Sequence, residues 1–136
     1  MTDCNCIFCK IAAGEIPSRT IRETEEFRVV LDVAPATKGH ALILPKNHYR
    51  NLLDLPQEMA QKAMVLAKET ALSMKESLGC DGINLVQNNE EAAGQTVFHF
   101  HLHVIPRYEK DEQKIVWTPR EFSLEEMDEI ADKLKR

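Results

Sequence analysis

The sequence predicts an α+β domain built on an antiparallel sheet. Three observations support this prediction: short apolar segments with tight turns at residues 19–32, one long helical pattern at residues 59–78, and regular polar/apolar alternation at residues 97–105. Strand and helix patterns segregate instead of alternating as βαβ units, which favours antiparallel pairing. The 136 residues contain neither a repeat nor a linker, so we expect a single domain over residues 1–136.

The first half of the chain predicts one short helix and three strands. A helix is expected at residues 6–13, where Gly14 can adopt the left-handed cap conformation and Pro17 blocks continuation. Strands at residues 19–23 and 27–32 form a hairpin around the polar residues 24–26. The apolar run 41–44 fits a buried strand that ends at Pro45, where a ladder donor is missing.

The second half begins with the long helix, whose apolar residues recur at helical spacing up to Gly79. Asp54 and Gln57 are expected to cap its start, with Pro56 in the first turn. Strands are expected at residues 83–86 and 97–105. The S-x-x-E pattern formed by residues 123–126 predicts a C-terminal helix.

The composition excludes several classes of function. Net charge is −5, from 17 Lys+Arg against 22 Asp+Glu, and the basic residues are scattered, so nucleic-acid binding is not expected. No window approaches the ~18–20 apolar residues of a membrane span, and no export signal precedes the domain. We therefore expect a cytoplasmic protein whose four cysteines are free thiols or metal ligands.

The alternation at residues 97–105 places three histidines on one face of a strand. The apolar face holds Phe98, Phe100, Leu102 and Val104, and the other face holds His99, His101 and His103. Neighbouring histidines would lie ~6.6 Å apart. Two kinds of site remain open: a metal centre held by imidazoles, or phosphorus chemistry with a neutral imidazole as nucleophile.

The segment just upstream is suited to an anionic oxygen. Glycine permits close backbone approach, and amide and hydroxyl groups can hold charge that develops on a phosphoryl group. The residues concerned are Asn88, Gly94, Gln95 and Thr96.

Residues 94–105 resemble the signature of the histidine triad (HIT) nucleotide-binding family. The resemblance extends over roughly residues 6–107 and includes the opening 6–11, Asp32 ahead of Pro35, Gly39–His40, the run 41–45 with Lys46 and His48, and Asn88. It implies a half-barrel-like antiparallel sheet and a homodimer paired through the long helix and a sheet edge. It also implies hydrolysis or transfer of nucleoside monophosphate groups, with a purine nucleotide or nucleoside phosphoramidate as ligand.

The resemblance further implies roles for individual residues. His101 would attack the α-phosphorus and form a nucleotidyl-histidine intermediate, which water then resolves. His103 and His40 would support the phosphate and the histidine cluster. Asp32 would accept the ribose hydroxyls, a role that suits an acceptor-only carboxylate. The phosphate or leaving group would be bound by Asn88, Gln95, Thr96 and His103.

Relatives with this opening imply a structural zinc site formed by Cys6, Cys9, His48 and His99. A Cys₂His₂ set is a closed tetrahedral shell without a position for water. The zinc would tether the N-terminal segment, about residues 1–17, to the catalytic strand, and Cys4 could replace Cys6. Residues from about 109 to 136 resemble the longer helical tails of bacterial members.

Four activities remain open at this point. The approach to the motif resembles the purine nucleoside phosphoramidase branch, whereas Pro106-Arg107-Tyr108 is also associated with relatives that cleave dinucleoside polyphosphates. A nucleotide-binding regulatory module with little turnover is a third hypothesis. A metal-dependent hydrolase that uses all three motif histidines as ligands is the fourth.

Overall fold

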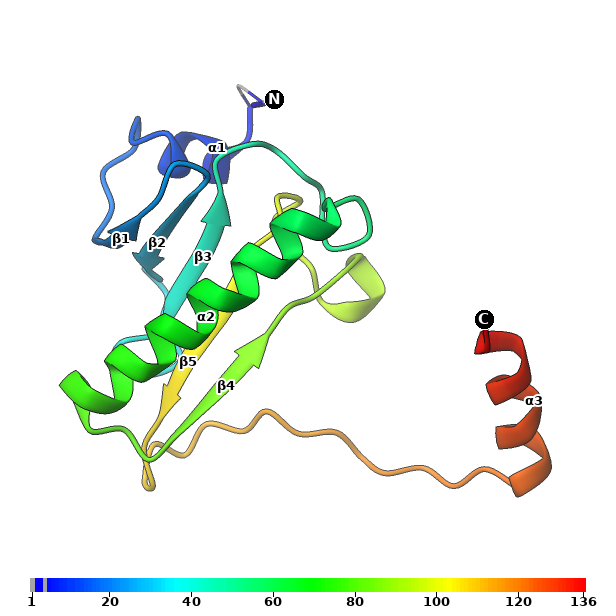
Figure 1. Cartoon of the computed structure of the whole chain (residues 1–136). Coiled ribbons are helices and arrows are strands. Elements are labelled where there is room, and N and C mark those ends of the chain that lie inside the picture. The colour runs from blue at the N-terminus through cyan, green and yellow to red at the C-terminus, as the bar shows by residue number, and fades with distance from the viewer. Residues whose placement is uncertain (1, 4) are drawn as a thin grey trace.

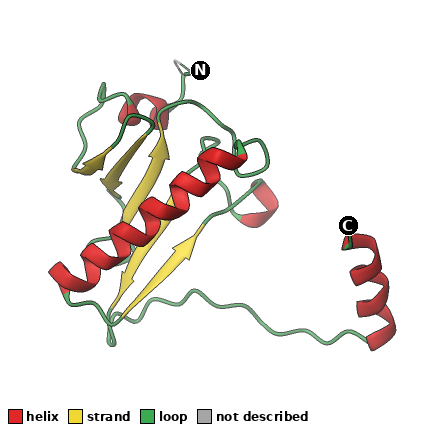
Figure 2. Ribbon diagram, viewed as in Figure 1, coloured by secondary structure: helices red, strands yellow, loops and turns green. Residues whose placement is uncertain are grey.

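The structure is a computed structural model that describes residues 2–3 and 5–136. Five strands form one antiparallel sheet in the order β1-β2-β3-β5-β4, and the long helix α2 crosses one face of it (Figures 1 and 2). The strands are β1 (Thr20–Glu23), β2 (Phe27–Leu31), β3 (Ala41–Pro45), β4 (Gly82–Val86) and β5 (Leu102–Arg107). The helices are α1 (Ile7–Ala12), α2 (Gln57–Leu78), the 3₁₀ turn η1 (Glu91–Ala93) and α3 (Leu124–Leu134). The predicted α+β class is confirmed.

The two central strands, β2 and β3, are buried on both faces because their residues alternate between two apolar clusters. Val29 and Ile43 join the main core beneath α2. Val30 and Leu42 join a smaller cluster with Phe8 of α1. The continuous apolar run of β3 follows from this double coverage, since both faces of the strand meet protein.

The predicted strand at residues 97–105 is only partly correct. Ladder pairing begins at Leu102, where β5 lies between β3 and β4, and residues 97–101 are outside the strand. The backbone N–H of Phe100 instead donates to the carbonyl of Tyr49 (2.7 Å). The predicted alternation persists at Phe100, Leu102 and Val104, which lie in the main core. Phe98 does not join them, because the guanidinium of Arg50 lies 4.3 Å from the centre of its ring.

The predicted cap of α2 is wrong. Pro56 occupies the N-cap position, without a side-chain hydrogen bond to the helix start. The carboxylate of Asp54 instead accepts from the backbone N–H groups of Arg50 (3.1 Å) and Asn51 (3.0 Å). Asp54 therefore closes the turn before the helix and does not cap the helix itself.

The C-terminal helix forms as predicted, and Ser123 and Glu126 make the reciprocal capping box. It lies away from the sheet at the end of an extended segment (Figure 1), and every residue from 112 to 136 is exposed. Among the described residues, no helix is both long and apolar enough to cross a membrane.

Candidate functional site

Four predicted metal ligands converge beside α1. Cys6 is the N-cap residue of α1, and its sulfur accepts from the backbone N–H of Cys9 one turn later. His48 follows β3, and His99 precedes β5. One side-chain donor atom from each of the four residues lies within 4.8 Å of the others. The fold thus brings together ligands that are up to 93 residues apart.

The geometry of this cluster fits a tetrahedral N₂S₂ centre. His99 Nδ1 lies 3.4 Å from the sulfurs of both Cys6 and Cys9, and His48 Nδ1 lies 3.3 Å from Cys9 Sγ. Zinc bonds of about 2.0–2.3 Å give a tetrahedron with edges of roughly 3.3–3.8 Å. His99 Nε2 donates to the carbonyl of Pro45 (2.8 Å), so the neutral ring directs the lone pair of Nδ1 toward the sulfurs.

A second cluster forms a hydrogen-bonded chain from the β2–β3 loop to β5. The backbone N–H of Ala36 donates to His40 Nδ1 (2.9 Å), so the neutral ring of His40 carries its proton on Nε2. This Nε2–H donates to His103 Nδ1 (2.8 Å) and lies 3.5 Å from a carboxylate oxygen of Asp32. His103, in turn, carries its own proton on Nε2. The order of donors and acceptors is therefore fixed by one backbone amide.

His101 lies between the two clusters and belongs to neither. Its Nδ1 donates to the carbonyl of His99 (2.8 Å), since a carbonyl oxygen can only accept. The neutral ring therefore has its lone pair on Nε2. Phe8 packs edge-on against the ring at 5.0 Å between centroids, and the ring of His103 lies at the same distance. Within the described residues the three motif histidines do not converge on one point, so the hypothesis of a three-histidine metal centre is contradicted.

Burial keeps His40, His101 and His103 neutral at pH 7. Desolvation lowers the pKa of His101 and of His40, although the Asp32 carboxylate acts in the opposite direction on both. Desolvation, with the neighbouring histidines, lowers the pKa of His103 to about 4. Neutral imidazoles are required for a nucleophilic lone pair and for the directed hydrogen bonds described above.

The loop that precedes the motif is held by Gln95, which is buried. Its amide oxygen accepts from the backbone N–H of Glu90 (2.8 Å) and from Asn51 Nδ2 (3.1 Å). Its amide nitrogen donates to the carbonyls of Arg50 (2.8 Å) and Val97 (3.1 Å). All four hydrogen-bonding positions of this amide are therefore occupied within the protein.

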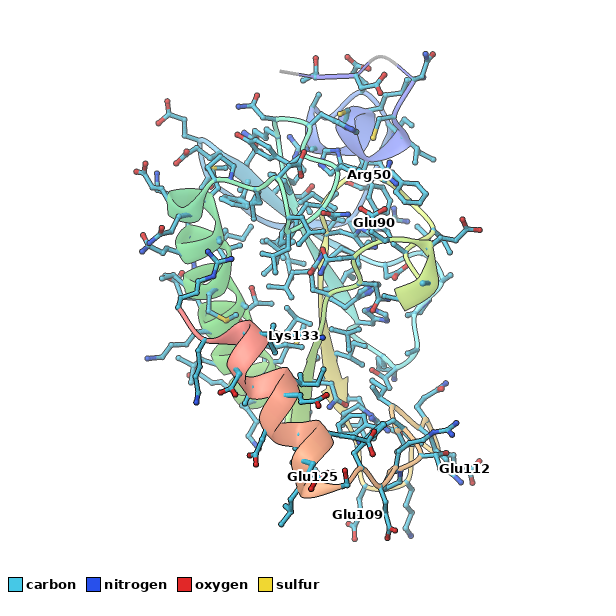
Figure 3. All side chains as sticks on the ribbon, turned by 90° about the vertical axis from the view of Figure 1, so that its right-hand side faces the viewer. Arg50, Glu90, Glu109, Glu112, Glu125 and Lys133 are labelled. Carbon is cyan, nitrogen blue, oxygen red and sulfur yellow. The ribbon has the colours of Figure 1, made fainter. Side chains whose placement is uncertain are left out.

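Glu90 connects this loop to the segment after β3. It has a positive φ of 73°, and its carboxylate accepts from Arg50 Nη2 (2.8 Å) and Asn51 Nδ2 (2.7 Å). The Arg50 guanidinium and the Asn51 amide lower the pKa of Glu90 to about 2. Figure 3 shows the Arg50 and Glu90 side chains next to each other below α1. This ion pair is half-exposed, so it stabilises the loop chiefly by fixing its geometry.

The remaining predicted residues lie along the same loop. A Cβ atom added to Gly94 would lie 3.7 Å from the amide nitrogen of Asn88, so these two residues adjoin. Thr96 is exposed and lines a cavity of about 510 Å³ together with Cys6, His48 and Arg50. Cys4, the suggested substitute for Cys6, is outside the described residues.

Several contributors were not predicted from the sequence, among them Arg50, Asn51 and Glu90, which hold the loop before the motif. Phe8 contacts the rings of both His99 and His101, and the only signal for it is its position between two cysteines. The carbonyl of Pro45 and the N–H of Ala36 fix two histidine tautomers. Backbone groups carry no residue-type signal, so sequence reasoning cannot find them.

These two clusters and the antiparallel sheet define the histidine triad class of nucleotide-binding protein. Residues 13–110 match the family model described as HIT domain, and the chain belongs to this family. It is 40% identical over 133 residues to adenosine 5'-monophosphoramidase HNT1 of Saccharomyces cerevisiae, covering 97% of this chain and 82% of that protein.

Solved structures show the same fold. SMU.412c from Streptococcus mutans has a TM-score of 0.92 at 39% identity, and the alignment covers 98% of this chain and 85% of that one. A Zn-bound histidine triad family protein from Mycobacterium smegmatis has a TM-score of 0.78 at 39% identity, with 85% and 84% of the two chains covered. The first alignment extends into the C-terminal tail.

Proposed function

We propose that this protein is a hydrolase that cleaves the bond between a purine nucleoside monophosphate and an amine, with His101 as nucleophile. The observation that carries this proposal is the hydrogen bond from His101 Nδ1 to the carbonyl of His99. This bond leaves the lone pair of Nε2 available for attack on phosphorus.

In the first step, His101 Nε2 attacks the α-phosphorus. The N–P bond to the histidine forms, the P–N bond to the leaving amine breaks, and the amine departs as its nitrogen takes up a proton from solvent water. The ring of His101 becomes cationic, and the acceptor carbonyl of His99 stabilises this charge through the Nδ1–H bond. The Nε2–H of His103 is available to donate to a phosphoryl oxygen as negative charge develops there.

In the second step, water attacks the phosphorus of the nucleotidyl-histidine. The histidine N–P bond breaks, the nucleoside monophosphate is released, and His101 regains its neutral state. His101 Nε2, which attacked in the first step, is the leaving group of the second. The positive charge of the ring favours its departure. Two displacements of moderate difficulty thus replace one difficult displacement.

The nucleotide would be held by residues around this centre. Asp32 would accept the ribose hydroxyls through the carboxylate capacity that Ala34 N–H and His40 leave free. Asn88 and Thr96 would bind the phosphate or leaving group. We assign Gln95 a supporting role, because its hydrogen bonds within the loop already occupy its amide.

We propose that zinc occupies the cluster of Cys6, Cys9, His48 and His99 as a structural ion. The four donors, their spacing and the orientation of His99 support this assignment. The ion would join the N-terminal segment, about residues 1–17, to the motif within a single domain of residues 1–136, with residues 109–136 as an extension. A reducing compartment such as the cytoplasm would keep both thiols available.

The leaving group is proposed to be an amine rather than a polyphosphate. The feature that suggested polyphosphate cleavage, Pro106-Arg107-Tyr108, is engaged in the fold. Arg107 donates to Asp111 (2.9 Å) and Asn84 (2.7 Å), and the Tyr108 hydroxyl donates to the carbonyl of Lys38 (2.7 Å). Adenosine 5'-monophosphoramidase HNT1, a relative whose alignment covers 97% of this chain, supports the same choice.

The test is steady-state hydrolysis of adenosine 5′-phosphoramidate beside a diadenosine polyphosphate. We expect faster phosphoramidate turnover and, after rapid quench in alkaline denaturant, in which the histidine N–P bond survives, a protein mass increased by one adenylyl group. His101→Asn keeps a donor for the carbonyl of His99 and lacks the nucleophile, so it should bind AMP normally and form no adduct. Native protein that binds AMP but hydrolyses neither substrate would instead identify a regulatory binding module.

A further inference from the structure

Within the described part of the chain, no element of the fold covers the apolar face of the C-terminal helix α3. Its large apolar residues recur three or four positions apart, which places them on one side of the helix. All are more than half exposed: Leu124 (79%), Met127 (56%), Ile130 (54%) and Leu134 (74%). The preceding segment exposes Val116 (77%), Trp117 (83%) and Phe122 (64%) as well. Such an exposed apolar set is unusual for a surface in contact with water only.

The body of the same chain has an apolar groove of suitable shape between α2 and the edge strand β1. Two hollows of about 430 and 300 Å³ adjoin there and share the ion pair of Arg22 and Glu69. The groove is lined by Ile21, Leu31, Met74 and Leu78 on one side of this pair and by Val65 and Leu66 on the other. An amphipathic helix that lays its apolar face into such a groove is a recurrent mode of recognition.

The charges of the helix and the groove are complementary. α3 carries five carboxylates and one lysine over residues 124–134. The groove is lined by three basic residues, Arg22, Lys38 and Lys62, and by two carboxylates, Glu69 and Glu26, which pair with Arg22 and Lys62. Lys38 has no ion-pair partner among residues 2–3 and 5–136, so the lining keeps one net positive charge. An acidic helix would therefore be attracted to this groove and repelled by a similar helix.

We propose that α3 of one chain docks in the α2–β1 groove of a second copy of this chain, and that the exchange is reciprocal. Each copy carries both the helix and the groove. In a two-fold dimer, each helix therefore fills the groove of the other copy, and no third component is needed. If each of the seven apolar side chains loses roughly 100 Å² of exposed surface, two tails bury about 1,400 Å², which lies within the range of stable interfaces.

The position of the tail favours a second copy over the chain's own body. Residues 109–123 leave the sheet at the end of β5 and hold α3 clear of it (Figure 1). Fifteen extended residues reach at most about 50 Å, which is sufficient to cross to a neighbouring protomer. The solved Streptococcus mutans structure aligns over 98% of this chain, so most of the tail takes a corresponding course there.

The test uses amine-reactive cross-linking of two differently marked full-length chains that are co-expressed and co-purified. One chain carries Lys38→Arg and Lys62→Arg, and the other carries Lys133→Arg. A link from Lys133 to Lys38 or Lys62 can then form only between chains. We expect this link in the mixed dimer at about half the yield of the native dimer, because only one of its two tail–groove contacts keeps both lysines.

A matched pair of variants tests the apolar contact. Ile130→Ser changes the apolar face of α3, and Glu129→Ser introduces the same residue on the other face. We expect Ile130→Ser to reduce the link roughly tenfold or more, as loss of a buried anchor does at interfaces, while Glu129→Ser retains it.

Three results would overturn the proposal. Links in native protein that vanish in the mixed pair would mean that the tail docks on its own body. Equal loss in both serine variants would mean that the apolar face is not the contact. Absence of any link from Lys133 to the groove would mean that α3 is free or has another partner.

Discussion

The hydrogen-bonded chain through His40 gives two substitutions with opposite expected effects. Asn at position 40 places its amide oxygen near the position of Nδ1 and can still accept from the N–H of Ala36. It cannot reach His103. Gln at position 40 places its terminal amide nitrogen near the position of Nε2 and can still donate to His103, but it leaves the N–H of Ala36 without an acceptor.

The expected magnitudes follow from these contacts. His40 is 5% exposed, so an orphaned Ala36 N–H in its place would be shielded from water and cost about 1–3 kcal/mol of unfolding free energy. In a domain of this size the Tm would fall by roughly 3–12 °C in His40→Gln. Loss of the donor to His103 should lower turnover about 10–100-fold in His40→Asn, the range found when a supporting hydrogen bond is removed from a functional histidine.

Thermal unfolding and phosphoramidate hydrolysis are measured on native protein, His40→Gln and His40→Asn. The first measurement checks the expected loss of stability and the second the expected loss of turnover. We expect His40→Gln to be the less stable variant and His40→Asn to be the less active one relative to its stability. The opposite ranking of stabilities would refute the tautomer assigned to His40. Equal activity of native protein and His40→Asn would refute the role of the chain in the reaction while leaving the stability argument intact.

Three further predictions concern stability and metal content. Cys9→Ser should lose most of the zinc that the native protein binds, measured by elemental analysis, and should unfold at a lower temperature than native protein. Because burial lowers the pKa of His103 to about 4 and an unfolded histidine titrates near 6.5, unfolding takes up a proton between these values. Stability in urea should therefore fall as the pH drops from about 6.5 toward 4, and a flat profile would contradict this. Gly39→Ala should cost about 2–4 kcal/mol, because φ is 100° and the new Cβ would lie 2.6 Å from Leu78 Cδ1 and 3.3 Å from Pro106 Cγ. Gly79→Ala, also at positive φ but with open space around it, is the control and should cost only about 1 kcal/mol.

The sequence predicted most of the fold because its signals are local. The hairpin at residues 20–31, the buried strand β3 and the capping box of α3 each depend on residues a few positions apart, and all three are present. The two errors arise where another partner competes, close by in the sequence for Asp54 and distant for Phe100. Asp54 satisfies the turn before α2, and Phe100 bonds to Tyr49 instead of continuing the ladder.

The resemblance assigned His99 to a zinc set and His101 and His103 to the phosphate, but the pattern of the residues alone did not divide them. Alternation placed the three histidines on one side of the chain and gave no reason for them to differ. The structure separates them through partners that are far away in the sequence: the cysteines of α1 for His99 and the β2–β3 loop for His103. His101 remains between these clusters, within reach of both neighbours and of Phe8.

The sequence by itself determined the class of fold, the family and the candidate site residues, because residue type and spacing suffice for these. Only the tertiary structure decided which nitrogen of each histidine carries a proton. That choice depends on the carbonyls of Pro45 and His99 and on the N–H of Ala36. These are backbone groups that every residue possesses, so their effect appears only once the chain is folded and their directions are fixed.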